Sequence, residues 1–154
     1  MTRPVESRLA DELAIRALVA RYCHSIAERD DKAWAESWCA EAEWKVLGQS
    51  VRGRAEILAH YQRLIAGCRF VQQVATDGLV EIEGDTARGK WQIAETILPK
   101  AGAAAINLGS YADRYQRDAD GAWRFARREF RGHYLGPADL SAAARPPAGW
   151  GREP

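Results

Sequence analysis

The chain has 154 residues, of which 47% are hydrophobic and 28% charged, a size and composition typical of one folded domain. Its 22 basic and 21 acidic side chains contain no run of five or six basic residues, which argues against nucleic acid as a partner. The N-terminal segment lacks the apolar core of a signal peptide, and no apolar stretch approaches the roughly 18 residues of a membrane span. We therefore expect a cytoplasmic protein without a membrane partner.

Two helices are predicted at the start of the chain. From Leu9 to about Glu28 apolar residues recur at helical spacing on one stripe, which predicts a long amphipathic helix. Asp30 then precedes the segment KAWAESWCAEA. An aspartate in that position accepts hydrogen bonds from the free N–H groups of a helix start. We therefore expect a second, short helix carrying Trp34 and Trp38.

The pattern then changes from helical to strand periodicity. AEWKVLGQSVRG predicts a strand and loop, and RAEILAHYQRLIAG predicts a third helix that ends at Gly67. After Phe70, β-branched and aromatic residues predominate and predict several antiparallel strands. The turn signals that divide these strands are Asp77-Gly78, Gly84-Asp85 and Asp120-Gly121. Helices followed by a run of strands predict an α+β fold, with the helices packed on one face of a curved sheet.

One domain is expected over residues 1–140, followed by a tail over 141–154. The tail, SAAARPPAGWGREP, contains three prolines and two glycines and shows little periodicity, so it could fold over a pocket or a partner. The three cysteines are irregularly spaced without a CxxC pair, and no metal-binding motif or glycine-rich phosphate loop occurs. We therefore expect neither a metal nor another cofactor.

Several short strings of the chain resemble one known family. They are Arg21-Tyr22, Trp38, Ala42-Glu43-Trp44, Gly53, Ile57, Ser110-Tyr111-Ala112-Asp113, Asp120-Gly121 and Trp123. With the order of the elements, they make the region from about Leu9 to Leu135 similar to the SnoaL-like branch of the nuclear transport factor 2-like superfamily. The resemblance implies a cone-shaped barrel whose curved sheet and first helix enclose a pocket for a small hydrophobic or cyclic molecule, generally without a cofactor. It also implies a homo-oligomer, either a dimer or a trimer.

The resemblance further implies the chemistry of the family's lyase members, in which an aspartate on the first helix and a histidine on a strand remove a proton together. Counting back from Trp44, the position of the aspartate holds Ala27. Counting back from Asp77, the position of the histidine holds Gln73. Neither side chain can act as a base, so the protein either catalyses with other groups or only binds its ligand.

Glu95 is the candidate replacement for the missing base. It shares one strand face, by alternation, with Trp91, Ile93 and Ile97. A carboxyl group on an apolar face has a raised pKa because burial disfavours its charged form, and such a group suits acid or base catalysis near neutral pH. The alternative is that a bulge turns Glu95 to solvent, or that a nearby arginine such as Arg131 pairs with it.

Tyr22 and His133 complete the candidate catalytic set with Glu95. Tyr22 lies on the buried stripe of the first helix and could donate to a developing oxyanion. His133 follows the last strand, where the tail could bring it over the mouth of the pocket. Ordinary roles remain open for both, as a core phenol and an exposed histidine. His24 and His60 are expected on outer surfaces.

Six further residues are predicted to bind the substrate, and each could equally be a core or sheet-face residue. Aromatic rings supply flat apolar walls, amides bind oxygen atoms without moving a proton, and an arginine binds an anionic group. The six are Trp44, Gln73, Trp91, Asn107, Tyr111 and Arg128. In the last predicted strand, Arg127, Glu129 and Arg131 alternate with Arg128, so its other face is predicted to be solvated or to contact another subunit.

The leading functional hypothesis is a cofactor-independent, dehydratase-like lyase or isomerase. It would abstract a proton from a small cyclic, largely apolar metabolite, with Glu95 as the base. One alternative is a non-catalytic binding protein for a small hydrophobic metabolite. Another is a small assembly subunit of a larger enzyme, whose outer sheet face would be the working surface. A buried titratable group on the pocket floor would favour the enzyme, and a filled cavity would favour the assembly subunit.

Overall fold

The computed structural model describes residues 5–147, which form three helices and six strands. In chain order these are α1 (Val5–Glu28), α2 (Asp31–Glu36), β1 (Trp38–Val46), β2 (Gln49–Arg52), α3 (Arg54–Ala66), β3 (Cys68–Glu83), β4 (Thr86–Pro99), β5 (Ala105–Arg117) and β6 (Trp123–Gly136). The long first helix, the third helix and the run of strands agree with the sequence prediction. No helix of the described residues is both long and apolar enough to cross a membrane.

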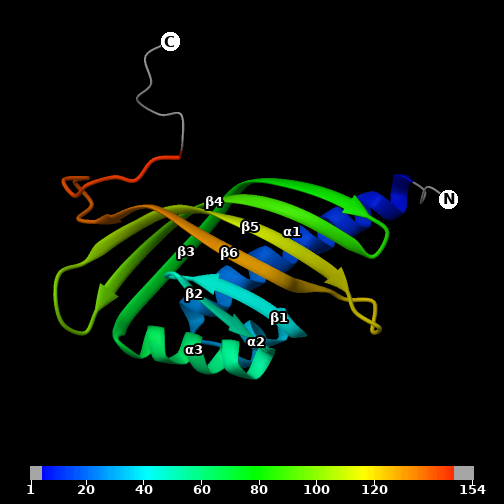
Figure 1. Cartoon of the computed structure of the whole chain (residues 1–154), viewed down its shortest axis with the longest axis horizontal. Helices are drawn as coiled ribbons and strands as arrows, with labels where there is room; N and C mark the ends of the chain where they lie inside the picture. Colours follow the sequence, from blue (N-terminus) through cyan, green and yellow to red (C-terminus); the bar gives the residue numbers. More distant parts are fainter. Residues whose placement is uncertain (1–4, 148–154) are drawn as a thin grey trace, which may run out of the picture.

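All six strands belong to one sheet, in the order β2-β1-β6-β5-β4-β3. β1 and β6 pair in parallel, and every other pair of neighbours is antiparallel. The sheet curls strongly, and Figure 1 shows α1 running diagonally behind it while α3 lies across its lower part. α1 packs against β3 and β6, and α3 packs against β1 and β2. The result is the predicted α+β barrel, in which helices cover the inner face of a curved and mostly antiparallel sheet.

Aromatic side chains hold the three helices against this inner face. Trp34 of α2 stacks on Tyr61 of α3 with ring centroids 4.0 Å apart, and both Trp38 and Phe125 lie within 6.2 Å of Tyr22 on α1, measured between centroids. Aromatic pairs contribute roughly 0.5–1.5 kcal/mol each beyond the area that they bury. This cluster joins α1, α2 and α3 to β1 and β6, and Tyr22 and Tyr61 from it also line a cavity between α1, α3 and the long strands.

Local signals start and stop several of these elements as predicted. The side chain of Asp30 accepts a hydrogen bond of 2.9 Å from the backbone N–H of Ala33 at the start of α2, and Gly67 ends α3. Gly84 and Gly121 adopt φ of 61° and 81° in the turns after β3 and β5, a conformation that costs glycine little because it has no Cβ.

The predicted helix around Trp34 and Trp38 is shorter than expected. α2 ends at Glu36, and Trp38 is the first residue of β1. The cause is pairing with a distant strand, because the backbone N–H of Phe125 donates to the carbonyl oxygen of Ser37 over 2.9 Å and Trp38 lies opposite Phe125 in the parallel ladder. Long-range pairing with β6 therefore overrides the local helical pattern after Ser37.

The predicted turn at Asp77-Gly78 is also wrong, because β3 continues through it from Cys68 to Glu83. The register with β4 shifts between Thr76 and Leu79, and Asp77 takes a φ of 50°. The two residues therefore form a bulge rather than a reversal. A Cβ on Gly78 would lie only 2.2 Å from the Trp91 ring, so the glycine is required by this close approach.

The tail folds back on the end of β6 as far as the structure describes it. The Tyr134 hydroxyl donates to the carbonyl oxygen of Pro137 over 2.7 Å and accepts from the N–H of Ala142 over 3.3 Å. Arg145 and His133 are joined by a backbone hydrogen bond. Residues 137–147 therefore lie beside the end of the barrel where β6 finishes, whereas the rest of the predicted tail, 148–154, lies outside the described residues.

Candidate active site

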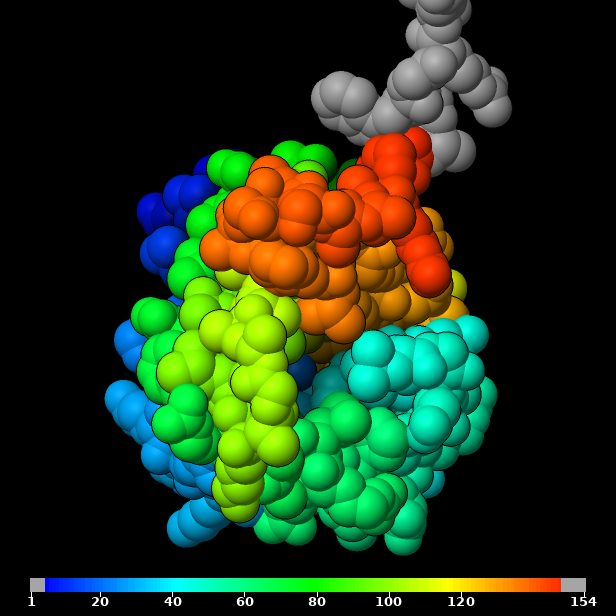
Figure 2. Space-filling view, turned by 90° about the vertical axis from the view of Figure 1, so that its left-hand side faces the viewer, coloured from blue at the N-terminus to red at the C-terminus, as the bar shows by residue number. Residues whose placement is uncertain are grey.

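A cavity of about 230 Å³ lies between the inner face of the sheet and helices α1 and α3. Its mouth corresponds to the hollow in Figure 2, where the β1–β2 hairpin, α3, the β4–β5 hairpin and the segment after β6 meet. The walls are largely apolar and include Trp44, Val46, Ile65, Val71, Ile97 and Phe130. A concave apolar site with a few convergent polar groups is the usual form of a small-molecule pocket.

Polar side chains gather around the carboxylate of Glu95 in this cavity. Gln73 on β3 donates from Nε2 to Oε2 of Glu95 over 2.7 Å, and Asn107 on β5 donates from Nδ2 to Oε1 over 3.4 Å. The register explains the arrangement, because Glu95 lies directly opposite Gln73 on one neighbouring strand and Asn107 on the other. Directly opposed residues share one face of a sheet, so the three side chains meet inside the barrel.

Burial raises the pKa of Glu95 above its ordinary value, and the hydrogen bonds from Gln73 and Asn107 offset part of that effect. Both donors are neutral amides, and Arg128 and Arg131, which could have neutralised the carboxylate, pair with Asp113 and Glu129 instead. Desolvation therefore outweighs the hydrogen bonds. A carboxyl group with a raised pKa exchanges its proton closer to neutral pH than an exposed glutamate does, as a general acid or base requires.

Two phenols line the same cavity as this carboxylate. The hydroxyl of Tyr111 lies 3.2 Å from Nε2 of Gln73, the nitrogen that also binds Glu95, and it is hydrogen-bonded to Tyr22. Burial raises the pKa of Tyr111 to about 12 and the pKa of Tyr22 well above its usual value. Both phenols therefore keep their protons at neutral pH and can act as hydrogen-bond donors.

Arg128 lies behind the phenols and not on the cavity wall. It is completely buried and donates two hydrogen bonds of 2.9 Å to Asp113. Its guanidinium carbon lies 4.4 Å from the ring centroid of Tyr22 and 3.8 Å from that of Tyr111. The arginine thus places a positive charge against the faces of both phenols and holds their rings in position.

Trp91 and His133 also lie outside the cavity. Trp91 lies on the predicted face of β4, but it packs further along the barrel than the cavity. There its indole Nε1 donates to the hydroxyl of Tyr115 over 2.8 Å. Nε2 of His133 lies 3.4 Å from Oγ of Ser110, and its Nδ1 lies 3.2 Å from the carbonyl oxygen of Arg145. His133 lines a neighbouring hollow near the mouth and not the chamber that contains the carboxylate.

The two positions that the resemblance assigns to a catalytic dyad lie close together. Ala27 on α1 and Gln73 on β3 line the same crevice, together with Cys23 and the exposed His24. Sγ of Cys23 lies 3.9 Å from Oε1 of Gln73, and burial raises the pKa of the thiol. The two positions thus border one hollow, and neither of them carries a base.

Besides placing Trp91, Arg128 and His133 in the pocket, sequence reasoning passed over Tyr61 and Asp113 and expected His60 on the surface. Tyr61 lines the cavity from α3. Its position on the apolar face of that helix could have predicted that it is buried near the pocket. Asp113 alternates with Tyr111 on the inner face of β5 and is buried, so the argument that singled out Glu95 applied to it as well. His60 was expected on the surface but is buried, with its ring 5.7 Å from that of Trp44.

Within residues 5–147, no three His, Cys, Asp or Glu side chains are grouped closely enough to hold a metal ion. Among the described residues, the polar side chains that line the cavity are the carboxylate of Glu95, two amides, three phenols, the indole of Trp44 and the thiol of Cys68. This set can accept one proton and donate several hydrogen bonds to a ligand oxygen.

Comparison with known proteins agrees with this fold. The family model of the SnoaL-like domain matches residues 7–129. A solved variant of a protein of unknown function from Mycobacterium tuberculosis is 32% identical, with 92% of this chain and 82% of that chain covered and a TM-score of 0.77. No match to a curated protein was found.

Two further solved structures share the fold at lower identity. Hexachlorocyclohexane dehydrochlorinase LinA-type3 from Novosphingobium barchaimii is 23% identical, with 84% of this chain and 91% of that chain covered and a TM-score of 0.77. A candidate scytalone dehydratase from Novosphingobium aromaticivorans is 17% identical, with 95% of this chain and 98% of that chain covered and a TM-score of 0.81. Because the family model matches most of its length, this chain belongs to the SnoaL-like domain family.

Proposed function

We propose that the protein is a cofactor-independent lyase or isomerase that removes a proton from a small cyclic, largely apolar molecule, with Glu95 as the base. The observation that carries this proposal is the carboxylate of Glu95 among neutral donors in an otherwise apolar cavity. Burial raises its pKa and makes it a stronger base than an exposed glutamate. A ligand that fills the cavity excludes water and strengthens this effect.

The cavity supports a ligand of one or two rings. Its volume of about 230 Å³ is smaller than the roughly 300–1,000 Å³ of pockets that hold drug-sized ligands. The rings of Trp44 and Phe130 form part of the wall. Flat aromatic surfaces of this kind suit ring-shaped molecules.

In the proposed reaction, Glu95 takes a proton from a carbon atom of the ligand. The electron pair left on that carbon forms a double bond, either as a leaving group departs or as an existing double bond shifts along the molecule. Negative charge that develops on a ligand oxygen is stabilised by the hydroxyl of Tyr111 and by the amides of Gln73 and Asn107. Glu95 then returns the proton to the leaving group or to another carbon, which regenerates the carboxylate.

A non-catalytic binding protein is the second candidate function. It is favoured by Ala27 and Gln73, which occupy the two positions where the resemblance places a catalytic aspartate and histidine. In such a protein the amides and phenols would only orient the ligand, and the proton on Glu95 would not move to it.

The test is deuterium exchange into bound ring compounds. A panel of one- and two-ring ketones, alcohols and halides, including cyclohexanone and 2-tetralone, is first screened for binding by thermal shift. Compounds that bind are then incubated with the protein in D₂O, and carbon-bound deuterium is followed by NMR. We expect exchange or turnover with the wild type, and retained binding without exchange in Glu95→Gln, which keeps the shape of the side chain but accepts no proton.

Two outcomes contradict the proposal in different ways. Exchange at the wild-type rate in Glu95→Gln would exclude Glu95 as the base while leaving the enzyme hypothesis intact. Tight binding with neither exchange nor turnover in the wild type would instead favour the binding protein.

A further inference from the structure

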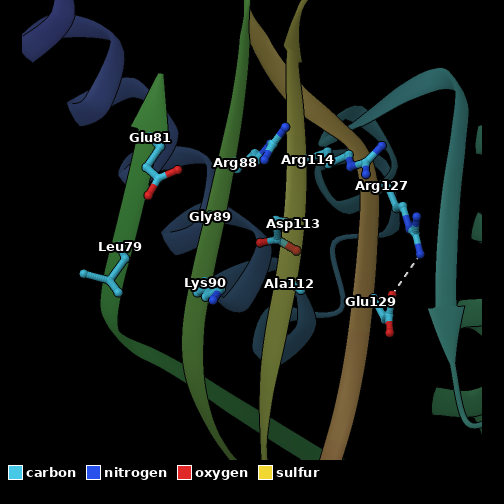
Figure 3. A pocket seen from close by; sticks show the side chains of 10 residues that line it. All are labelled: Leu79, Glu81, Arg88, Gly89, Lys90, Ala112, Asp113, Arg114, Arg127 and Glu129. Carbon is cyan, nitrogen blue, oxygen red and sulfur yellow. Dashed lines mark hydrogen bonds and ion pairs between the residues drawn. The ribbon is translucent and has the colours of Figure 1, made fainter. Parts of the chain in front are cut away.

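A second hollow, of about 470 Å³, lies on the outer face of the sheet. It is lined by residues of β3, β4, β5 and β6, and Figure 3 shows their side chains over the strands. Ala112 lies between Lys90 and Glu129 in the strand register, and its small side chain leaves the hollow open between longer neighbours. The cavity that contains the proposed active site is lined from the opposite, inner face of the same sheet.

Three arginines from neighbouring strands form a row across this hollow. Arg88 of β4 lies opposite Arg114 of β5, and Arg114 lies opposite Arg127 of β6. Figure 3 shows the three side chains side by side, with Lys90 two residues further along β4 from Arg88, level with Ala112. Like charges at directly opposed positions of a sheet lower its stability. The fold does not require arginine at these three positions, so the row reduces stability without a structural need.

Carboxylates lie at both ends of this row, with Glu81 opposite Arg88 and Glu43 opposite Arg127 in the strand register, but within the described part of the chain only Arg127 forms ion pairs with its acidic neighbours. Arg127 lies 2.8 Å from Glu129 and 3.5 Å from Glu43. Among the described residues, Arg88, Arg114 and Lys90 take part in no ion pair and no side-chain hydrogen bond. The hollow therefore contains guanidinium and ammonium groups whose hydrogen-bond donors face solvent.

Positive charge is concentrated on this face. The row of Arg114 and the next row, which runs through Ala112, together contain six basic and three acidic side chains, whereas the formal net charge of the whole chain is only +1. The basic residues are Lys45, Arg52, Arg88, Lys90, Arg114 and Arg127, and the acidic residues are Glu43, Glu81 and Glu129. The hollow is therefore an electropositive site on a protein that is otherwise close to neutral.

We propose that the outer hollow binds a small multivalent oxyanion of the phosphate class, held by Arg88, Arg114 and Lys90. The planar guanidinium group matches the geometry of phosphate and donates two parallel hydrogen bonds to it. A bound anion would also remove the repulsion within the row. A small ligand fits better than a nucleic acid, because Glu81 and Glu129 flank the basic groups and would repel a phosphate backbone that extends beyond the hollow.

The test is an NMR titration of the ¹⁵N-labelled full-length protein with sodium pyrophosphate, and in parallel with sodium chloride at matched ionic strength. We expect saturable shifts confined to the strand segments around residues 88–90, 112–114 and 127–129, produced by pyrophosphate but not by chloride. Arg114→Gln and Arg88→Gln should each weaken binding by about tenfold or more, because each removes one charge-assisted contact. Arg63→Gln, which changes an exposed arginine of α3, is the matched control and should bind like the wild type.

Three outcomes would overturn the proposal. They are equal shifts with chloride, unchanged pyrophosphate binding in Arg114→Gln, and a wild-type dimer that Arg114→Gln dissociates in sedimentation velocity. The last result would identify the face as a contact between two copies of the chain. Thermal unfolding of each variant checks that folding is intact, as expected for exposed side chains without partners. None of these readouts depends on the proposed chemistry of Glu95.

Discussion

Arg128 on β6 and Asp113 on β5 form a completely buried ion pair through two hydrogen bonds of 2.9 Å. The guanidinium group is enclosed by the rings of Tyr22, Tyr111 and Phe125, with centroids at 4.4, 3.8 and 4.1 Å. The pair joins two neighbouring strands directly behind the phenols of the candidate site. It therefore couples the stability of the barrel to the position of the groups that face the cavity.

Removing the carboxylate of Asp113 should be strongly destabilising. Asp113→Asn leaves the charge of Arg128 buried without its counter-ion, and we expect the free energy of unfolding to fall by about 3–5 kcal/mol. Urea denaturation followed by circular dichroism measures the change. Glu36→Gln, which breaks an exposed pair with Lys32, is the control and should cost less than about 0.5 kcal/mol. Similar losses of unfolding free energy in both variants would show that the buried ion pair of Arg128 contributes no more to stability than an exposed one.

The raised pKa of Glu95 predicts a pH-dependent stability difference. In the unfolded chain the pKa of a glutamate is about 4.3, whereas burial raises it in the folded protein. The folded state then holds the proton more tightly, so Glu95 contributes most to stability below about pH 4.3, and this contribution is lost as the pH rises through the raised pKa. Relative to Glu95→Gln, the wild type should therefore lose stability from about pH 4 towards neutrality. Parallel pH–stability curves for the two proteins would contradict the raised pKa.

Gln73 should tune this pKa. Its amide donates to Glu95 over 2.7 Å and lowers the pKa of the carboxyl group, so Gln73→Leu should raise that pKa further. Asn107→Leu should cause a smaller rise, because its hydrogen bond is longer, at 3.4 Å. Carbon-detected NMR titration of the Glu95 side-chain carboxyl group measures both shifts. A lower pKa in Gln73→Leu would mean that the amide is not the donor to the charged form.

Gly78 should not tolerate a side chain. In Gly78→Ala the new Cβ would lie 2.2 Å from an atom of the Trp91 ring, and the bulge in β3 or the indole would have to move. We expect a loss of about 1–3 kcal/mol, the usual cost of overpacking, measured by thermal or urea unfolding. Gly67→Ala is the matched control, because its φ is negative and the nearest heavy atom lies at 3.9 Å. Equal stability of the two variants would refute the steric argument.

Much of the fold and the centre of the candidate site could be predicted from the sequence by itself. Helical and strand periodicities are local properties, and they predicted α1, α3, the run of strands and the α+β class. The same alternation placed Glu95 on an apolar strand face. The sequence also shows that Ala27 and Gln73, at the two positions to which the resemblance assigns a catalytic dyad, cannot act as bases, because this depends only on the identity of the residues there.

The tertiary structure decided which distant groups meet. Trp38 became a strand residue because β6, more than 80 residues later in the sequence, offered backbone partners that outweigh local helical preference. Gln73 and Asn107 are the partners of Glu95 because β4 pairs with β3 on one side and with β5 on the other. Arg128 pairs with Asp113 and therefore does not line the cavity. Periodicity specifies which face a residue occupies, but hydrogen bonding between strands and the packing of buried side chains decide what lies opposite it.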